Sequence, residues 1–134
     1  MAQPPRERRQ NQRRNMTATL YPPSSQPLNE MRQRLAPEAH DAFQVFSEKV
    51  FAAGALPSKI KQIIAVAVAH VTQCPYCIKG HTKMALRMGA TPQELIEAIW
   101  VAAEMRAGGA YAHSSLAIAT FGEEQARQKG ASGR

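Results

Sequence analysis

Hydrophobic side chains recur at spacings of three and four along much of the chain, which is the period of an amphipathic helix. The clearest case runs from Pro37 to Ala53, and its apolar positions are Ala39, Phe43, Phe46, Val50 and Phe51. Pro37 suits a first helical turn, and Gly54 suits a helix stop. No run alternates with the period of two that is typical of a half-buried strand. The pattern therefore predicts an all-α fold.

The stretch 58–72 is apolar almost all round after its first turn, which predicts a central, buried helix. Cys74-Pro75 interrupts this stretch, because proline lacks an N–H group and disfavours helix at the residue before it. A new helix is expected to begin at Pro75, to run to Met88 and to end at Gly89.

Thr91-Pro92-Gln93-Glu94 has the pattern of a capping box with proline at the first helical position, and it predicts a helix through about Arg106. The pair Gly108-Gly109 is expected to break the chain, so that a last helix runs from about Ala110 to Gln128. Together these elements predict a bundle of about five to six helices with short connections.

Residues 1–27 are polar and proline-rich, and we expect a disordered tail followed by a folded domain at residues 28–134. Residues 1–15 carry five arginines against Glu7, a net charge of +4, which leaves +3 of the total +7 for the rest of the chain. A basic tail can contact nucleic acid or an anionic surface. We expect a plain disordered extension and no nucleic-acid partner. A start at Met16, with the arginine-rich stretch as an upstream extension of the reading frame, stays open as an alternative.

The 134 residues suit one domain, and the low aromatic content of 6% predicts a core of small and branched aliphatic side chains. Polar residues interrupt every apolar stretch before it reaches the length of a membrane span. The basic N-terminus is not followed by the apolar region of a secretory signal. We therefore expect no membrane association and a cytoplasmic location, where a Cys-x-x-Cys pair indicates redox or metal chemistry.

The strongest candidate for chemistry is the segment from Cys74 to His81. A helix that begins at Pro75 makes Cys74 its N-cap and puts Cys77 in its first turn, where free N–H groups and the helix dipole favour an anion. Such a position lowers the pKa of a thiol and raises the fraction of reactive thiolate. His81 follows Cys77 by four residues, so the two side chains share a helix face. The imidazole can take the thiol proton or stabilise the thiolate.

Three further polar residues lie near the two cysteines in the sequence: a histidine, a tyrosine and a glutamine. His70 precedes Cys74 by four residues, and two interpretations stay open: a proton relay, or a buried histidine satisfied by hydrogen bonds. Tyr76, between the cysteines, is expected to shield the sulfurs or to pack at an interface. Gln62 lies two helical turns before His70.

The run from Leu56 to His113 resembles the alkylhydroperoxidase D-like branch of the carboxymuconolactone decarboxylase superfamily. The resemblance covers most of residues 35–120 and rests on the cysteine and histidine spacing, the Gly-Ala-Thr turn and the Gly-Gly pair. Its matching text is Lys61-Gln62-Ile63-Ile64-Ala65-Val66-Ala67-Val68, Gln73-Cys74-Pro75-Tyr76-Cys77-Ile78-Lys79-Gly80-His81, Ala85-Leu86-Arg87-Met88-Gly89-Ala90-Thr91 and Glu94-Leu95-Ile96-Glu97-Ala98-Ile99-Trp100.

The resemblance implies an all-helical bundle that assembles into trimers or hexamers and reduces hydroperoxides through a Cys74–Cys77 dithiol–disulfide cycle. It implies Cys77 as the peroxide-attacking thiol, Cys74 as the resolving thiol and His81 as part of a proton relay. It also implies a lipoyl-protein, a peroxiredoxin or another thiol reductant as partner, with no bound cofactor and no metal. From the residues alone, the N-cap position equally favours Cys74 as the nucleophile.

The sequence departs from the family pattern at two positions. The relay glutamate of the family falls on Gln62, and glutamine cannot accept and release a proton as a general base. The histidine sometimes found between the cysteines is Tyr76. Both changes weaken the relay, so thiol redox chemistry is a firmer expectation than efficient peroxidase turnover. His70 as a substitute base is a hypothesis.

Two other functions remain as alternatives. The superfamily includes lactone decarboxylases, whose chemistry does not require a dithiol. A non-catalytic zinc or redox-sensing module is the second, since Cys74, Cys77, His81 and either His70 or His113 are suitable zinc ligands. A short chain with so apolar a helix at 58–72 is expected to form a homo-oligomer.

Overall fold

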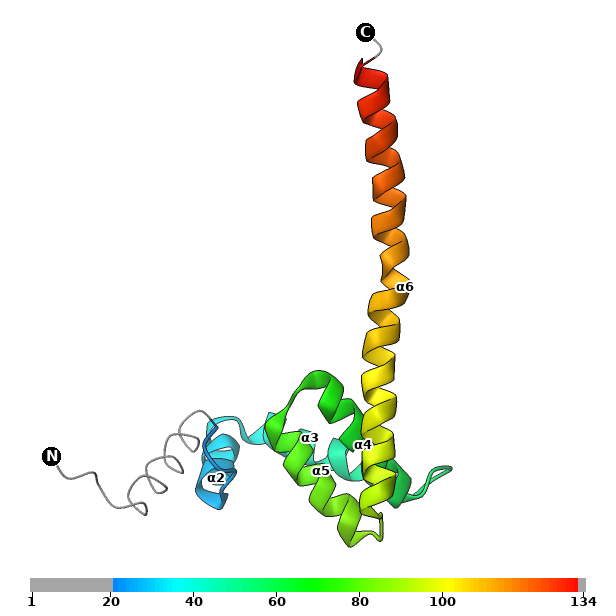
Figure 1. Ribbon diagram of the computed structural model, residues 1–134. Helices are drawn as coiled ribbons and strands as arrows, with labels where there is room; N and C mark the ends of the chain where they lie inside the picture. Colours follow the sequence, from blue (N-terminus) through cyan, green and yellow to red (C-terminus); the bar gives the residue numbers. More distant parts are fainter. Residues whose placement is uncertain (1–20, 133–134) are drawn as a thin grey trace, which may run out of the picture. The chain divides into compact units, whose positions relative to one another are not determined.

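The computed structural model describes residues 21–132, which form five helices and no strand (Figure 1). These helices are α2 (Gln26–Leu35), α3 (Pro37–Phe51), α4 (Ser58–Thr72), α5 (Pro75–Arg87) and α6 (Pro92–Ser132). The predicted all-α class is confirmed. Most of the predicted tail lies outside the described residues, and α2 begins two residues before the expected boundary at Leu28.

The chain divides into two units between Ala55 and Leu56. In the first unit, α2 and α3 pair through polar contacts, among them a hydrogen bond of 3.1 Å from Gln33 Nε2 to Asp41 Oδ1. The predicted apolar face of the 37–53 helix is present, but no side chain of α3 is buried and Phe43 is 63% exposed. Residues 21–55, the described part of the first unit, therefore have no hydrophobic core of their own.

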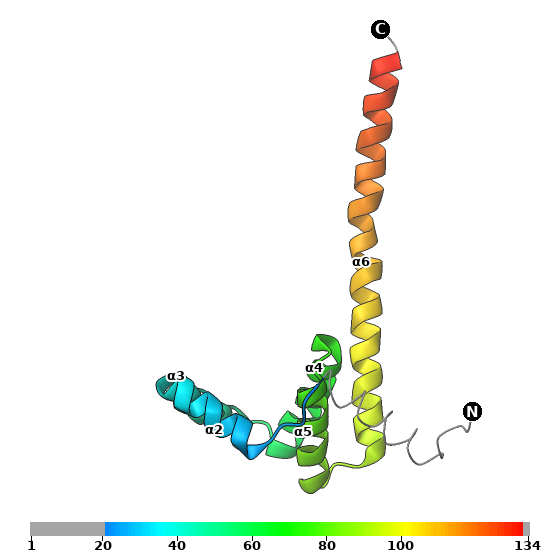
Figure 2. The same ribbon diagram turned by 90° about the vertical axis from the view of Figure 1, so that its left-hand side faces the viewer.

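The second unit is built on α4, which contacts both α5 and α6 (Figures 1 and 2). Its core consists of Val66, Ala85, Ala90 and Leu95. The small side chain of Ala85 on α5 allows this helix to approach α4 closely. Leu95 packs the first turns of α6 against the same cluster. This packing holds the connection between α4 and α5, and with it the two cysteines, in place.

The expectation of a central, buried helix at 58–72 is confirmed for its position between α5 and α6 and is wrong for its burial in the single chain. Only Gln62, Val66 and Ala69 of α4 are buried, whereas Ile64 and Val68 are about half exposed. The physical reason is that, within the second unit, α4 packs against α5 and α6, and these two neighbours leave one apolar side of the helix uncovered.

The turn between α5 and α6 carries both signals that the sequence indicated. Gly89 has a φ of +85°, and the N–H of Ala90 donates to the carbonyl of Ala85 over 2.9 Å, so a left-handed glycine ends the helix. The capping box is confirmed: Thr91 N–H donates to Glu94 Oε2 and Glu94 N–H donates to Thr91 Oγ1. Lys59 Nζ reaches Glu94 over 2.8 Å and fastens the start of α4 to the start of α6.

The predicted break at Gly108-Gly109 is wrong, because α6 runs without interruption from Pro92 to Ser132. A glycine inside a helix costs about 1 kcal/mol relative to alanine, which weakens a helix but does not by itself end it. The alanine-rich sequence on both sides offsets that cost. The result is that α6 continues far beyond α4 and α5 in both views (Figures 1 and 2). Within residues 21–132, no helix combines the length and apolarity needed to cross a membrane.

Candidate active site

The two cysteines lie where α4 ends and α5 begins. Gln73 closes α4 in the left-handed conformation, with a φ of 55°, and Cys74 follows in an extended conformation as the N-cap of α5. Pro75 occupies the first helical position, where its missing N–H costs nothing. The two-residue connection therefore fixes Cys74 at the helix N-terminus, as the sequence predicted.

The thiols of Cys74 and Cys77 form one hydrogen-bonded pair. Both cysteines are free and partly buried, and the N–H of Cys77 donates to Cys74 Sγ over 3.3 Å. This contact is the N-cap bond of α5, made by a sulfur atom in place of the usual oxygen.

The hydrogen bonds of the pair favour a negative charge on Cys74. The Cys77 thiol, followed by the Cys77 N–H, donates to Cys74 and lowers the pKa of Cys74 below that of an ordinary cysteine. The same thiol contact, together with burial, raises the pKa of Cys77. Of the two thiols in the reduced pair, Cys74 is therefore the one that loses its proton more readily.

His81 and Gln62 meet across the α4–α5 contact. The Nδ1 atom of His81 lies 2.8 Å from Oε1 of Gln62, whose side chain is 4% exposed. An amide oxygen only accepts, so Nδ1 of His81 carries the hydrogen in this contact. The sequence placed both residues in the candidate site, but it gave no sign that they contact each other.

His70 is held by its own helix. Its Nδ1 atom lies 2.8 Å from the carbonyl oxygen of Val66, one turn earlier on α4. Within residues 21–132, no hydrogen bond joins His70 to Cys74, Cys77 or His81. Of the two interpretations left open by the sequence, this geometry supports the hydrogen-bonded histidine. The role of His70 as a base remains a hypothesis.

Tyr76 lies on the solvent side of the first turn of α5 and is 42% exposed. Among the described residues, no three histidine, cysteine or carboxylate side chains come close enough together to hold a metal ion. The zinc alternative of Cys74, Cys77, His81 and a further histidine is therefore without a preformed ligand cluster in this part of the chain.

Comparison with known proteins gives a consistent set of relatives. Residues 37–120 match the model of the carboxymuconolactone decarboxylase family. The uncharacterised protein 4 in the cox locus of Paracoccus denitrificans is 57% identical over 108 residues, which span 81% of this chain and 96% of that protein. An uncharacterised protein of Cupriavidus necator is 38% identical over 85 residues, which span 63% of this chain and 75% of that protein.

Two solved structures share the fold. A protein from Methanobacterium thermoautotrophicum has a TM-score of 0.62 and 35% identity, over 66% of this chain and 97% of that one. A carboxymuconolactone decarboxylase family protein from Legionella pneumophila, solved in its apo form, has a TM-score of 0.55 and 29% identity, over 69% of this chain and 74% of that one.

Proposed function

This chain belongs to the carboxymuconolactone decarboxylase family, and from that premise we propose that it is a thiol-dependent oxidoreductase that reduces hydroperoxides or exchanges disulfides. The observation that carries the proposal is the pair of free cysteines at the N-terminus of α5, with the N–H of Cys77 on the sulfur of Cys74. A helix N-terminus stabilises a thiolate, and the second thiol stands next to it, as a dithiol–disulfide cycle requires.

The proposed reaction balances without a bound cofactor. A cysteine thiolate attacks one oxygen of the hydroperoxide, the O–O bond breaks, and the leaving alkoxide takes a proton to become an alcohol. The sulfenic acid that remains is attacked by the second cysteine, which forms the disulfide and releases water. Two thiols and one hydroperoxide thus give one disulfide, one alcohol and one water. A thiol or lipoyl reductant returns two electrons and two protons.

We assign the attack to Cys74, because the thiolate is the reacting species and the hydrogen bonds of the pair put the charge on this sulfur. The family resemblance implies the reverse order, with Cys77 attacking and Cys74 resolving. In either order His81 lies one turn beyond Cys77 and can pass a proton to the leaving oxygen, while Gln62 orients its ring. Gln62 cannot itself exchange a proton, which favours slow peroxide turnover.

The experiment that tests the proposal counts free thiols and bound metal on the purified protein before and after one equivalent of hydrogen peroxide. We expect the loss of both thiols per chain, a mass decrease of about two hydrogens and recovery of both thiols with dithiothreitol. Thiols that survive a large excess of peroxide, or stoichiometric zinc that protects them, would contradict it. A lactone decarboxylase gives the dithiol no part in its chemistry, and no contact described for residues 21–132 favours that alternative.

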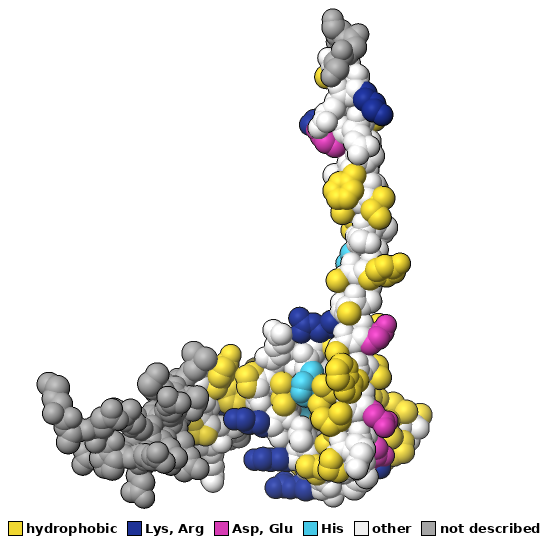
Figure 3. All heavy atoms as spheres, in the orientation of Figure 1, with side chains coloured by type: hydrophobic (Ala, Val, Ile, Leu, Met, Phe, Trp, Pro, Cys, Tyr) yellow, Lys and Arg dark blue, Asp and Glu magenta, His cyan; other side chains and the backbone are white. Residues whose placement is uncertain are grey.

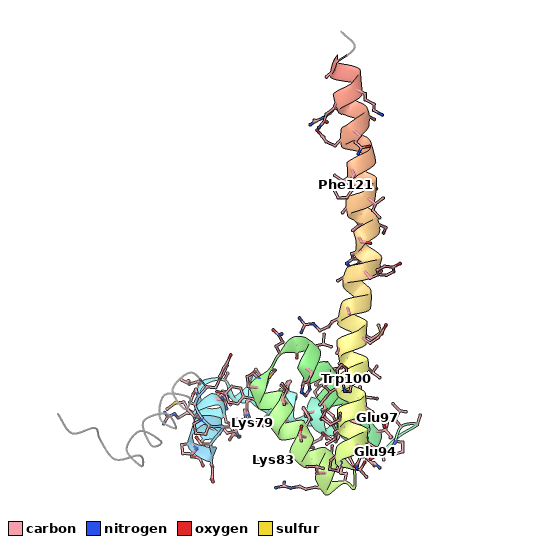
Figure 4. All side chains as sticks on the ribbon, in the orientation of Figure 1. Lys79, Lys83, Glu94, Glu97, Trp100 and Phe121 are labelled. Atoms are coloured by element: carbon pink, nitrogen blue, oxygen red, sulfur yellow. The ribbon has the colours of Figure 1, made fainter. Side chains whose placement is uncertain are left out.

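We also propose that the protein acts as a trimer-based homo-oligomer in the cytoplasm, where reductants keep dithiols reduced. Large apolar side chains stand exposed along α6, both beside α4 at Trp100 and beyond α4 toward Phe121 (Figures 3 and 4). Trp100, Tyr111 and Phe121 are 71%, 82% and 60% exposed. These three rings alone offer roughly 400 Å², about half of the ~800 Å² per partner in a standard interface. Light scattering of the purified protein is expected to give a mass of three or six chains, and a monomer would contradict it.

A further inference from the structure

The helices that carry the candidate active site are entirely without acidic residues. Between Glu48 and Glu94 the sequence contains six lysines and arginines and no aspartate or glutamate. One of these cations, Lys59, pairs with Glu94 at the start of α6. The overall charge of +7 is therefore not confined to the N-terminal tail, and part of it lies on the same helix as the dithiol.

Three of these cations form a row on α5, here called the basic ridge: Lys79, Lys83 and Arg87. Because they are four residues apart, their side chains stand one above the other on one face of the helix. All three are exposed, and this face is turned away from the buried Ala85. Figure 3 shows basic side chains gathered over α5, and in Figure 4 Lys79 and Lys83 project to the same side.

The basic ridge works against the stability of α5. Like charges four residues apart destabilise a helix by about 0.2–0.5 kcal/mol per pair, and no described residue offers the ridge an ion pair. The helix dipole favours Arg87 in the last turn of α5, but local structure gives no such reason for Lys79 and Lys83. A binding partner with the opposite charge would give one, because it would turn this repulsion into attraction on contact.

The ridge begins within one helical turn of the cysteines along α5. Lys79 follows Cys77 by two residues, so the two side chains lie on different sides of the helix. The exposed Tyr76, between the two cysteines in the sequence, lies on the ridge face one turn before Lys79. Eight residues of helix place the first and last cations about 12 Å apart. A small hydroperoxide or disulfide cannot span such a row, whereas the side of a protein that carries several carboxylates can.

We propose that the basic ridge docks an acidic protein dithiol, which returns the Cys74–Cys77 disulfide to the reduced state. The inference rests on the proposed thiol cycle and names the partner class for its reductive half. That half requires two electrons per turnover, which a dithiol protein supplies and which a nucleic acid or a lipid surface does not. Charge attraction raises the rate of encounter and holds the partner dithiol near the Cys74–Cys77 disulfide.

The reductive step is a pair of thiol–disulfide exchanges. One thiolate of the partner attacks a sulfur of the Cys74–Cys77 disulfide, so that a mixed disulfide forms and the other cysteine leaves as a thiolate. The second thiol of the partner attacks the mixed disulfide, which closes the disulfide of the partner and releases the remaining cysteine. The partner loses two electrons and two protons, and this protein gains them.

The test uses two synthetic helical peptides as probes, each with a Cys-x-x-Cys pair. One carries glutamates at three successive positions four residues apart, and the other carries glutamines there. The full-length protein is oxidised with diamide, so the disulfide forms without peroxide. We expect the acidic peptide to reduce it about tenfold faster than the neutral one at low ionic strength, and the preference to shrink to less than about twofold near 0.5 M salt.

The variants separate the ridge from overall charge. Lys79→Glu/Lys83→Glu is expected to abolish or invert the preference for the acidic peptide. Arg127→Glu/Lys129→Glu makes the same change in net charge near the far end of α6, and it is expected to keep the preference. Dithiothreitol, which is uncharged, should reduce every variant at the same rate and so verifies that each disulfide is intact and accessible.

Equal rates for the two peptides at low salt, or equal loss in the two double variants, would overturn the proposal. A DNA duplex that binds the unaltered protein but not Lys79→Glu/Lys83→Glu, without a preference between the peptides, would assign the ridge to nucleic acid instead. Failure of peroxide to form the disulfide would remove the proposed peroxidase activity, while the diamide-based measurement would still decide the docking.

Discussion

Replacement of either cysteine by serine is expected to lower peroxide turnover by about a thousandfold or more, because the disulfide needs both sulfur atoms and the two thiols act as a unit. The two variants differ in a single turnover. Cys77→Ser keeps Cys74 at the N-cap, with the N–H and the hydroxyl of residue 77 as donors to its sulfur. We expect this variant to react with one equivalent of peroxide and to stop as a sulfenic acid.

The dependence on pH gives the same comparison without peroxide. In the folded protein the pKa of Cys74 is lowered by its contacts with Cys77, so its thiolate fraction at pH 7 exceeds that of an ordinary cysteine (about 8.5). Alkylation of Cys77→Ser by iodoacetamide should therefore reach half its maximum rate at a lower pH than alkylation of Cys74→Ser. At pH 7 the difference in rate is expected to be about tenfold.

Trapping with dimedone and mass spectrometry measures the sulfenic acid in both variants. Circular dichroism serves as the folding control, since α5 must be intact for the comparison to hold. A sulfenic acid that forms readily in Cys74→Ser and not in Cys77→Ser would contradict our assignment. It would support the order implied by the family resemblance, in which Cys77 attacks.

The sequence predicted most of the fold around the cysteines. Cys74-Pro75 and the capping box at Thr91 predicted where α5 and α6 begin, because both rest on local backbone chemistry that neighbouring residues settle. The break predicted at Gly108-Gly109 was wrong, because each glycine disfavours a helix by only about 1 kcal/mol and the surrounding alanines favour the helix enough to offset that cost. Burial of α4 failed for another reason: periodicity shows which faces are apolar but not what covers them.

The candidate site was predictable in its members and not in its contacts. The spacing of Cys74, Cys77 and His81 follows from one helix, so the sequence alone could place them together. The contact between His81 and Gln62 joins two residues that are 19 positions apart and lie on different helices, so it depends on tertiary packing. The basic ridge lies within a stretch of 45 residues, 49–93, that contains no aspartate or glutamate. The five arginines of the tail account for most of the net charge, so the charge total did not single out this stretch.

Substitution of Gln62→Glu is expected to raise the rate of peroxide reduction by about tenfold to a hundredfold. The side chains have nearly the same shape, so a carboxylate can accept the same hydrogen bond from Nδ1 of His81 at the present 2.8 Å. The added negative charge stabilises the imidazolium, and the pair can then take a proton from a thiol and deliver it to the leaving oxygen. Gln62 provides the hydrogen bond without that charge.

The expected gain depends on contact with His81, which the controls isolate. Gln93→Glu adds the same charge at an exposed position at the start of α6, and it should leave the rate unchanged. In a His81→Asn background Gln62→Glu should bring no gain, because the imidazole that the carboxylate acts on is gone. The measurement is peroxide consumption with dithiothreitol in excess, together with a melting curve, since a buried carboxylate also costs stability when it is poorly paired. If Gln62→Glu folds and its thiols react with the same reagents, but its rate of peroxide reduction rises no more than that of Gln93→Glu, the glutamine at position 62 is not the cause of slow turnover.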